Sequence, residues 1–367
     1  MFARSVDMVC NDTHAIEITI ESSVMTQHTR VTMADVAAAA GVSVMSVSYA
    51  YGRPDRVSEE TRGKVFAAAE RLGYSGPHRG AQSLRSGRTN NLAVVLTEKL
   101  TYAFDDPRAR RFLSGVADAC LDTDTGLVLL PNRSVDADAD RVRDAAVDGY
   151  VFWTTVTGDP LLSVAVSTGR PVCVQGCPQH AGTTLISIDD VAAAEAIARV
   201  ALAGARRPLV SAFPSDKHRE RRLEYGPDPE GVEFPVTRNR LRGYRAAVVA
   251  AGLDWSDVPV AFGTGSFRAE GVRAMQDHGR ALRADAVLAM SDEVALGALE
   301  VVHEDGLDVP GDIAIVGWDD TEDAAGAGLT TVAQSLYEQG RSAARAVLGG
   351  DAVATPQWRV VRRTSTR

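Results

Sequence analysis

Two kinds of hydrophobic pattern divide the chain near residue 90. Before that point, small apolar residues recur at helical spacing in the segments 32–41, 44–51 and 58–72. After it, short apolar runs alternate with longer amphipathic segments, which is the rhythm of parallel strands joined by helices. The pattern therefore predicts a small all-α domain followed by a larger α/β domain.

The first two helical segments contain the signals of a helix-turn-helix. Thr32 precedes the first helix as a cap, and Asp35 stands where its carboxylate completes a capping box. Gly41 suits the left-handed position that ends a helix, and Ser43 can cap a second helix over 44–51. Two helices of small residues joined by a short turn with glycine predict a DNA-binding motif whose second helix enters the major groove. An ordinary pair of core helices has the same pattern.

A third helix is predicted after a loop at 53–57. Ser58 can cap it, Glu59 and Glu60 stand at its positive end, and Gly73 can end it. A bundle of three short helices is a sufficient core for a small domain of this kind, so the three segments are expected to fold together.

The α/β domain is predicted to contain two rounds of a doubly wound parallel sheet. The predicted strands are 92–96, 126–130, 149–153, 171–174, 185–188, 209–213, 258–262, 286–290 and 313–316. The predicted helices are 112–120, 140–147, 191–202, 240–251, 271–277 and 293–304. Two such rounds imply two lobes with a cleft between them, where the carboxyl ends of the strands present polar groups to a ligand.

The formal net charge of −9 is unevenly distributed along the chain. Residues 31–90 hold eight Lys and Arg against five Asp and Glu, a net +3, so the rest of the chain carries −12. A basic head on an acidic body confines attraction to phosphate groups to one end of the protein.

The four cysteines do not suggest a metal or redox site. Cys173 and Cys177 lack the Cys-x-x-Cys spacing, Cys10 and Cys120 stand far from them, and no histidines are placed to complete a zinc site. We expect buried free thiols in a reducing cytosol, with no metal and no cofactor.

Residues 1–30 match neither the helical pattern nor a secretory signal. Acidic residues at positions 7, 12, 17 and 21 interrupt every apolar run there. No apolar run in the chain approaches the roughly 18 residues of a membrane span. We expect a disordered extension or a misassigned start, with Met25 as an alternative first residue.

Consecutive motifs from Val31 onward carry a family resemblance. The first group is V-T-M-A-D-V-A-A-A-A-G-V-S, V-S-E-E-T-R, A-A-A-E-R-L-G-Y and A-Q-S-L-R-S-G-R-T. The second group is R-N-R-L-R-G-Y, S-D-E-V-A-L-G-A, V-G-W-D-D and L-T-T-V-A-Q. In their order they resemble the lactose/galactose repressor (LacI/GalR-type) family of bacterial transcriptional regulators.

The resemblance implies a particular domain organisation. It comprises an all-α helix-turn-helix headpiece at 31–78, a hinge helix or linker at 79–90, and a two-lobed α/β effector domain like the periplasmic binding proteins at 91–367. The first lobe is expected at about 91–190 and 333–350, and the second at about 191–332 and 351–367.

The resemblance also implies which residues contact DNA. Val44, Met45 and Tyr49 are expected to face the major groove, although the family often has a polar residue or an arginine in place of Tyr49. Such a surface suits thymine methyl groups and groove shape. The expected phosphate contacts are Thr32, Ser43, Ser46 and Ser48. The expected hinge contacts are Arg79, Ala81 and Leu84, with Leu84 as a minor-groove wedge or, alternatively, an ordinary linker leucine.

On the ligand side, the resemblance implies four residues in the cleft: Arg240, Ser291, Asp319 and Gln334. An arginine fork and a carboxylate can grip neighbouring hydroxyls of a sugar or nucleoside. Three residues of the first lobe are candidates for the opposite wall, and ordinary packing accounts for them equally well: Thr97, Phe104 and Trp153.

Three further expectations concern the frame of the cleft. Asp292 and Asp320 are expected to cap helices or brace the hinge. Gln334 is expected in the first turn of the final helix. Residues 211–237 are longer and more charged than the family's usual connection, and we expect a mobile, solvated loop at the cleft rim.

Together these observations predict a sequence-specific DNA-binding transcriptional regulator, a repressor controlled by a small polar, sugar-like effector. It is expected to be a cytoplasmic, nucleoid-associated homodimer on double-stranded operator DNA. A sugar-binding transport protein with the same body would need a signal peptide and no headpiece. An enzyme on this fold would need a nucleophile and base, a metal cluster or a Gly-rich phosphate loop, and the sequence suggests none of these. The effector, the operator and the direction of control stay open.

Overall fold

The computed structural model describes residues 31–76, 88–96, 100–132, 136–350 and 355–367. The chain divides into two compact units, Met1–Gln82 and Ser83–Arg367. Four residues with expected roles, Arg79, Ala81, Leu84 and Thr97, lie outside the described residues.

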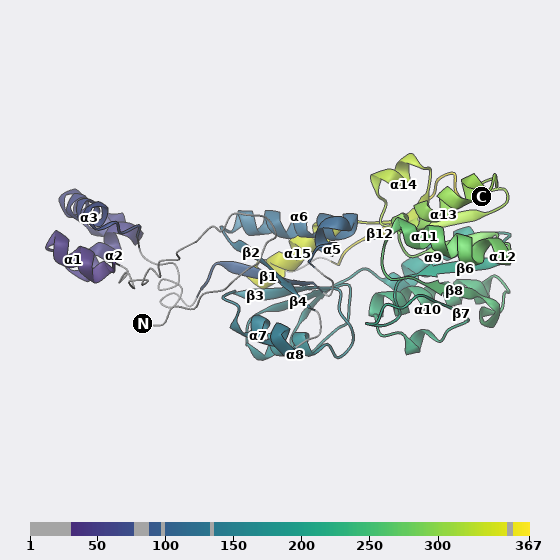
Figure 1. The fold of residues 1–367 in the computed structure, drawn as a ribbon, viewed down its shortest axis with the longest axis horizontal. Helices are drawn as coiled ribbons and strands as arrows, with labels where there is room; N and C mark the ends of the chain where they lie inside the picture. The colour runs from purple at the N-terminus through teal and green to yellow at the C-terminus, as the bar shows by residue number, and fades with distance from the viewer. Residues whose placement is uncertain (1–30, 77–87, 97–99, 133–135, 351–354) are drawn as a thin grey trace, which may run out of the picture. The chain divides into compact units, whose positions relative to one another are not determined.

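The described residues of the first unit form a small helical headpiece (Figure 1). Its elements are α1 (Met33–Ala40), α2 (Val44–Gly52), the 3₁₀ turn η1 (Pro54–Arg56) and α3 (Glu59–Leu72). The capping box of Thr32 and Asp35 is confirmed, and Gly41 ends α1 at a φ of 64°. Ser43 and Ser58 cap α2 and α3 as predicted.

The headpiece core consists of small apolar residues, with aromatic rings packed against each other at its edge. Val36, Val47 and Val65 are fully buried. The Tyr51 ring lies edge-on to the Phe66 ring, with 5.0 Å between their centroids. The alanines of this core have small side chains, which let the three helices pack closely together.

The first lobe of the second unit is built on a parallel five-stranded sheet of order β2-β1-β3-β4-β5. Its strands are β1 (Asn91–Leu96), β2 (Gly126–Pro131), β3 (Gly149–Trp153), β4 (Val172–Gln175) and β5 (Thr184–Ile186). Its helices are α5 (Tyr102–Asp105), α6 (Pro107–Asp122), α7 (Asp136–Asp144), α8 (Pro160–Ser167) and α15 (Leu336–Leu348). Strands β1 and β3 are buried on both faces, which explains their unbroken apolar sequences.

The second lobe is built on a seven-stranded sheet of order β12-β11-β10-β9-β6-β8-β7. Its strands are β6 (Pro208–Ala212), β7 (Arg222–Tyr225), β8 (Pro259–Phe262), β9 (Ala286–Ala289), β10 (Ala314–Trp318), β11 (Thr330–Gln334) and β12 (Trp358–Val361). Only the two edge strands, β7 and β12, pair antiparallel with their neighbours among these described strands. The predicted fold class, an all-α headpiece with a two-lobed α/β body, is confirmed.

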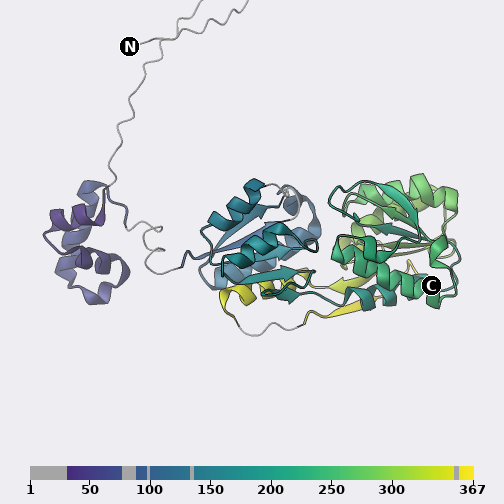
Figure 2. The ribbon, with the colours of Figure 1, turned by 90° about the horizontal axis from the view of Figure 1, so that it is seen from below.

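Helices cover the sheet of the second lobe (Figure 1). They are α9 (Asp190–Ala201), η2 (Pro229–Gly231), α10 (Pro235–Ala250), η3 (Trp255–Asp257), α11 (Arg268–Arg273), the π-helical turn η4 (Ala274–Gly279), α12 (Arg280–Leu282), α13 (Asp292–Glu304) and α14 (Glu322–Gly326). The chain changes lobe between β5 and α9, between β11 and α15, and between α15 and β12, and the yellow C-terminal elements accordingly lie in both lobes (Figure 2).

Helices α6 and α15 approach each other at two glycines. A Cβ atom on Gly115 would lie 1.9 Å from the Tyr337 carbonyl oxygen, and one on Gly340 would lie 2.1 Å from the Phe112 carbonyl oxygen. Only glycine permits this approach. It holds the start of α15 against the first lobe, directly beside the connection that leads from β11.

The structure corrects three expectations about the frame. Residues 211–237 are not simply a loop, because β7 pairs with β8 and Arg221 binds Glu270 at 2.6 Å. Gln334 ends β11, and α15 begins two residues later because Ser335 provides its cap. Asp292 is not a cap either: Ser291 caps α13, and Asp292 is the first helical residue.

Among the described residues, no single helix is long and apolar enough to cross a bilayer. Helices α1 and α2 have the length and apolar composition of a membrane span only when they are counted together. The chain bends by 106° at the turn between them.

Candidate DNA-binding and effector-binding sites

The start of α2 carries the exposed apolar residues of the headpiece that the sequence assigns to DNA. Met45 is 58% exposed and Val44 44%, both in the first turn. Tyr49, one turn further on, is only half-exposed, as is Ser48. Val44 and Met45 therefore form the accessible apolar tip of α2, and Tyr49 is less exposed than either.

The hydroxyl groups expected to contact phosphates already serve the helix ends. Thr32 Oγ1 donates to Asp35 Oδ2 at 2.7 Å. Ser43 Oγ accepts from the Ser46 backbone N–H at 3.0 Å and lies 2.9 Å from Ser46 Oγ. A phosphate contact by Thr32 or Ser43 must share or replace a capping bond.

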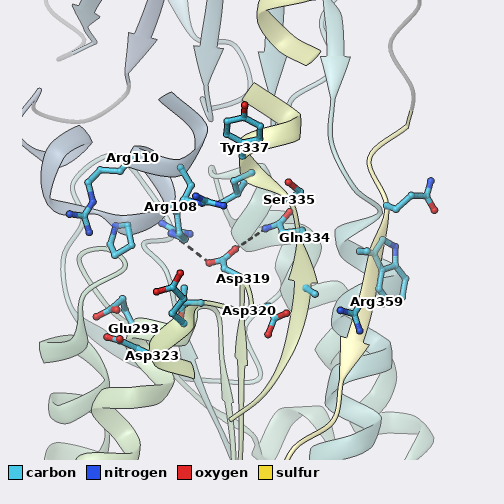
Figure 3. Close-up of a pocket in the computed structure, with 18 residues that line it drawn as sticks. Arg108, Arg110, Glu293, Asp319, Asp320, Asp323, Gln334, Ser335, Tyr337 and Arg359 are labelled. Atoms are coloured by element: carbon cyan, nitrogen blue, oxygen red, sulfur yellow. Dashed lines mark hydrogen bonds and ion pairs between the residues drawn. The ribbon is translucent and has the colours of Figure 1, made fainter. Parts of the chain in front are cut away.

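A cavity of about 720 Å³ lies between the two lobes of the second unit (Figure 3). Its first-lobe wall includes three arginines at the start of α6: Arg108, Arg110 and Arg111. Its second-lobe wall includes five acidic residues: Glu293, Asp319, Asp320, Glu322 and Asp323. Walls of opposite charge thus face each other across a volume large enough for a small polar molecule.

Two smaller cavities, of about 70 and 40 Å³, adjoin this region. Arg108 lines all three cavities, and Trp153 lines both small ones. Asp319 and Gln334 line the largest and the smallest, and Arg240 lines the smallest. Arg108 therefore lies at the junction of the 720 Å³ cavity with the two smaller ones.

Asp319 is the acidic residue at the centre of Figure 3. It follows β10 with a φ of 108°, a conformation that costs energy for any residue other than glycine. Its Oδ1 accepts from Gln334 Nε2 at 2.8 Å, and its Oδ2 lies 3.8 Å from Arg108 Nε. Burial raises the pKa of Asp319 to about 6, while the charges of Arg108 and Arg240 oppose that rise.

A continuous chain of side-chain hydrogen bonds joins the lobes and ends at Asp319. Gln175 at the end of β4 donates to Gln339 at 2.9 Å, Gln339 in α15 donates to Gln334 at 3.0 Å, and Gln334 donates to Asp319. Gln175 and Gln339 belong to the first lobe, whereas Gln334 ends β11 and Asp319 follows β10 in the second lobe. A ligand that engages Asp319 acts on a network that spans the hinge.

Arg240 is held inside the second lobe. Its Nε donates to Asp190 Oδ1 at 3.1 Å, and its Nη1 donates to the Met290 carbonyl. The guanidinium lies 3.8 Å from the centroid of the Trp318 ring and 5.4 Å from that of Phe213. These contacts preorganise the arginine at the inner end of the cleft.

Asp292 braces the segment beyond Asp319. Its Oδ2 accepts from the Thr321 backbone N–H at 2.8 Å, and its Oδ1 accepts from Thr331 Oγ1 at 2.7 Å. Burial and the nearby charge of Asp319 raise the pKa of Asp292 to about 7. Asp292 thus ties the segment after β10 to β11 within the second lobe.

Comparison with known proteins gives the chain a family. Residues 32–76 match the model of the bacterial regulatory proteins of the lacI family, and residues 212–366 match the periplasmic binding protein-like domain. An HTH-type transcriptional regulator of Mycolicibacterium smegmatis is 36% identical over 329 residues, which are 86% of this chain and 89% of that protein. CelR of Thermobifida fusca is 32% identical over 332 residues, 88% of this chain and 92% of the relative.

The chain belongs to the LacI family. It is a DNA-binding transcriptional regulator with a helix-turn-helix headpiece and a periplasmic-binding-protein-like body. A solved structure of the CelR–cellobiose complex matches 92% of this chain and all of its own chain, with a TM-score of 0.62 and 29% identity. The Lac repressor dimer bound to operator and the anti-inducer ONPF covers 92% of this chain at a TM-score of 0.69, and at 24% identity it supports the fold.

For this LacI-family chain, the expected effector residues fall into two groups. Arg240, Asp319, Gln334 and Trp153 converge on the interlobe cavities. Ser291 is buried, and its hydroxyl accepts from Ser266 Oγ at 2.9 Å while capping α13.

Phe104 is not brought to the cleft. It is 62% exposed on α5 and lines none of the three interlobe cavities. Its position after a strand suggested the cleft, but the short helix α5 carries its side chain outward.

The fold places at the cleft several residues that the sequence pattern did not indicate. The most important are Asp106, Arg108, Gln175, Phe213 and Gln339. Asp106-Pro107 was a recognisable helix start, since Asp caps well and Pro suits the first turn. Nothing in the sequence joins Gln175 to Gln339, which are 164 residues apart.

The three described cysteines are all free, but only two of them are buried as predicted, and Cys177 is partly exposed. Cys120 and Cys173 are buried free thiols, and burial raises their pKa values to about 11 and about 12. Within the described residues no group of three or more His, Cys, Asp or Glu could hold a metal ion.

Proposed function

We propose that this regulator is a homodimeric operator-binding repressor that is controlled by a small polar effector between the lobes. The observation that carries the proposal is Asp319: a buried carboxylate beside a cavity of about 720 Å³, bonded into a network that joins both lobes. A ligand that donates to Asp319 changes the balance between lobe arrangements, and a coupling of about 1–3 kcal/mol is enough for a switch.

The residues proposed to hold the effector are Asp319, Gln334, Arg240 and Trp153. Asp319 and Gln334 supply a carboxylate and an amide for hydroxyl groups, and Trp153 supplies an apolar face at the inner end. The relatives include a ribose operon repressor and a regulator solved with cellobiose, which favours a sugar-like effector here.

On the DNA side, we propose that Val44 and Met45 contact base edges while Ser43, Ser46 and Thr32 contact phosphates. The exposure of Val44 and Met45 in the first turn of α2 supports this assignment. The protein is proposed to act in the cytoplasm, and the site is proposed to bind its ligand without chemical change, since the relatives are named as transcriptional regulators.

The test joins a ligand screen to a DNA-binding measurement. Thermal unfolding of the full chain is followed with a sugar panel that includes ribose and cellobiose, because a ligand selective for the folded state raises the midpoint. A positive ligand is then titrated against an operator selected in vitro, in wild type, in Asp319→Asn and in the exposed control Asp257→Asn. The proposal predicts a response in wild type and the control and its loss in Asp319→Asn; an equal response in all three contradicts it.

A further inference from the structure

The cavity of about 40 Å³ is the innermost of the three, and it is lined by Arg108 and Arg240. Each of these arginines has a carboxylate partner of its own. Arg108 Nη2 lies 3.0 Å from Asp106 Oδ2, and Arg108 Nε lies 3.4 Å from Asp106 Oδ1. Arg240 is paired with Asp190 at 3.1 Å. The side chains of Asp106 and Asp190 are almost completely buried, so solvent screens neither pair well.

Asp319 is a third carboxylate at the same place. Its buried Oδ2 accepts no hydrogen bond from any described residue, and the same holds for the buried Oε1 of Gln175. The innermost cavity thus has two oxygen atoms that need donors and three carboxylates against two arginines nearby. A group that donates hydrogen bonds is favoured there, and a further negative charge is not.

Asp106 is built to hold Arg108 in this neutralised state. It caps α6, with Oδ1 accepting from the Arg108 backbone N–H at 3.0 Å, and its two oxygens also bind the guanidinium of the same residue. On its other side, the Arg108 guanidinium lies 4.7 Å from the centroid of the Phe213 ring, which belongs to the second lobe. Arg108 is therefore fixed from both lobes, and Asp106 occupies its fork.

We propose that Asp106 sets the charge selectivity of the cleft, by neutralising Arg108 so that the site takes uncharged polyhydroxy or amino-substituted ligands and rejects phosphorylated or acidic ones. This inference rests on the proposed function, because it takes the interlobe cleft to be the effector site. An arginine at a cleft mouth ordinarily attracts phosphate or carboxylate groups; here the fork that would bind them is already bound.

A second-lobe arginine that lines one of the same cavities provides a matched control. Arg219 lines the 70 Å³ cavity together with Arg108. Its Nη1 donates to the Thr264 carbonyl at 3.1 Å, and its guanidinium lies 5.2 Å from the Phe234 ring centroid. If a phosphate site is created by releasing Arg108, it must depend on Arg108 and not on Arg219.

The experiment uses inorganic phosphate as the probe and the full chain as the protein. Binding is followed by tryptophan fluorescence and calorimetry at constant ionic strength, in wild type and in Asp106→Asn. Asparagine caps a helix as well as aspartate does, so this variant removes the charge and keeps the cap. We expect no saturable binding to wild type in the millimolar range and binding at least roughly tenfold tighter in Asp106→Asn, since one close like charge has been removed.

Two double variants locate the new site. Asp106→Asn with Arg108→Gln should lose the gained binding, whereas Asp106→Asn with Arg219→Gln should keep it. Asp106→Ser, which also caps well, replaces Asp106→Asn if the latter unfolds. Saturable phosphate binding by wild type that Arg108→Gln abolishes would overturn the inference, as would the absence of any gain in a folded Asp106 variant.

Failure of the two proposals can be told apart. The phosphate titrations concern what the cleft accepts and need no DNA. If they succeed while no cleft ligand alters operator binding, the proposed function fails and the selectivity of the cleft stands. If a phosphorylated sugar releases or strengthens operator binding by wild type, the selectivity fails and the proposed function stands.

Discussion

Helix α2 of the headpiece and the interlobe cleft differ in exposure and in the contacts that hold their residues. The start of α2 exposes Val44 and Met45 on a helix held by its own local caps. The cleft buries Asp319 and Arg240 in contacts between residues distant in sequence, such as Gln175 with Gln339. The first surface can thus be described from neighbouring residues alone, whereas the second exists only after both lobes have folded.

The largest expected effect separates the two regions altogether. A chain of residues 88–367 should remain folded and ligand-competent, because the described contacts of its lobes lie within the second unit. It should lose its specific affinity for operator by roughly a factor of 10³ or more, the usual margin between specific and non-specific binding. Fluorescence anisotropy at fixed salt is the measurement, and retained sequence-specific binding would show that the headpiece is not the DNA-binding element.

The next prediction contrasts glycines of the two regions. Gly115→Ala should destabilise the second unit by about 3 kcal/mol or more, because a Cβ atom there meets the Tyr337 carbonyl oxygen at 1.9 Å. Gly63→Ala in α3 should be neutral or stabilising by up to about 1 kcal/mol, because nothing lies within 4 Å of its Cβ position. Urea unfolding measures both, and a mild effect at Gly115 would mean that α6 and α15 pack differently.

The headpiece is held by local contacts and the cleft by long-range ones, so the sequence predicts the first region better than the second. The Thr32–Asp35 capping box, the Ser43 cap and the Gly41 turn are local, and all three were predicted correctly. The buried strands were also predictable, since continuous apolar runs need only burial on both faces. The edge strand β7 was not, because Arg222 and the preceding Arg221 resemble residues of a solvated loop until their partners Asp216 and Glu270 are known.

The cleft residues were predicted from the family resemblance and not from the hydrophobic pattern or the local sequence. Asp319 and Gln334 were placed in that way, and the structure brings both to the cavity. Arg108 and Asp106 were missed because their importance depends on Phe213 and Asp319, more than 100 residues away. Phe104 shows the converse error, since the end of a strand does not decide where the next side chain points.

A smaller effect concerns the pH dependence of the cleft. Burial raises the pKa of Asp292 to about 7 and that of Asp319 to about 6, from an ordinary value of 3.8. Between these values the folded protein binds protons that the unfolded chain has released. The free energy of unfolding therefore falls as pH rises from about 4 to about 7.

The test compares thermal midpoints of wild type, Asp292→Asn and the exposed control Asp257→Asn. Between about pH 5 and about pH 8, the midpoint of Asp292→Asn should rise relative to wild type, because the neutral amide has no charge to bury. Asp257→Asn should follow wild type throughout. Parallel curves for all three would contradict the assignment of raised pKa values to the buried pair.

The smallest effect belongs to a cap of the headpiece. Ser43→Ala should cost the headpiece about 1 kcal/mol, because the Ser46 backbone N–H loses its acceptor. The unfolding of the second unit should be unchanged. Hydrogen exchange at the amides of α2 gives the local value, and an equal loss of protection in the lobes would mean that the two units do not unfold independently.

The account depends most on coupling between a ligand beside Asp319 and DNA on the headpiece. Linkage requires that a ligand which changes operator affinity by some factor has its own affinity changed by operator by the same factor. The decisive measurement determines both factors for one ligand found in the thermal screen, by anisotropy for DNA and calorimetry for the ligand, in wild type and Asp319→Asn. The account predicts equal factors of roughly 5 to 150 in wild type and no coupling in the variant. A ligand whose affinity is the same with and without operator would contradict it.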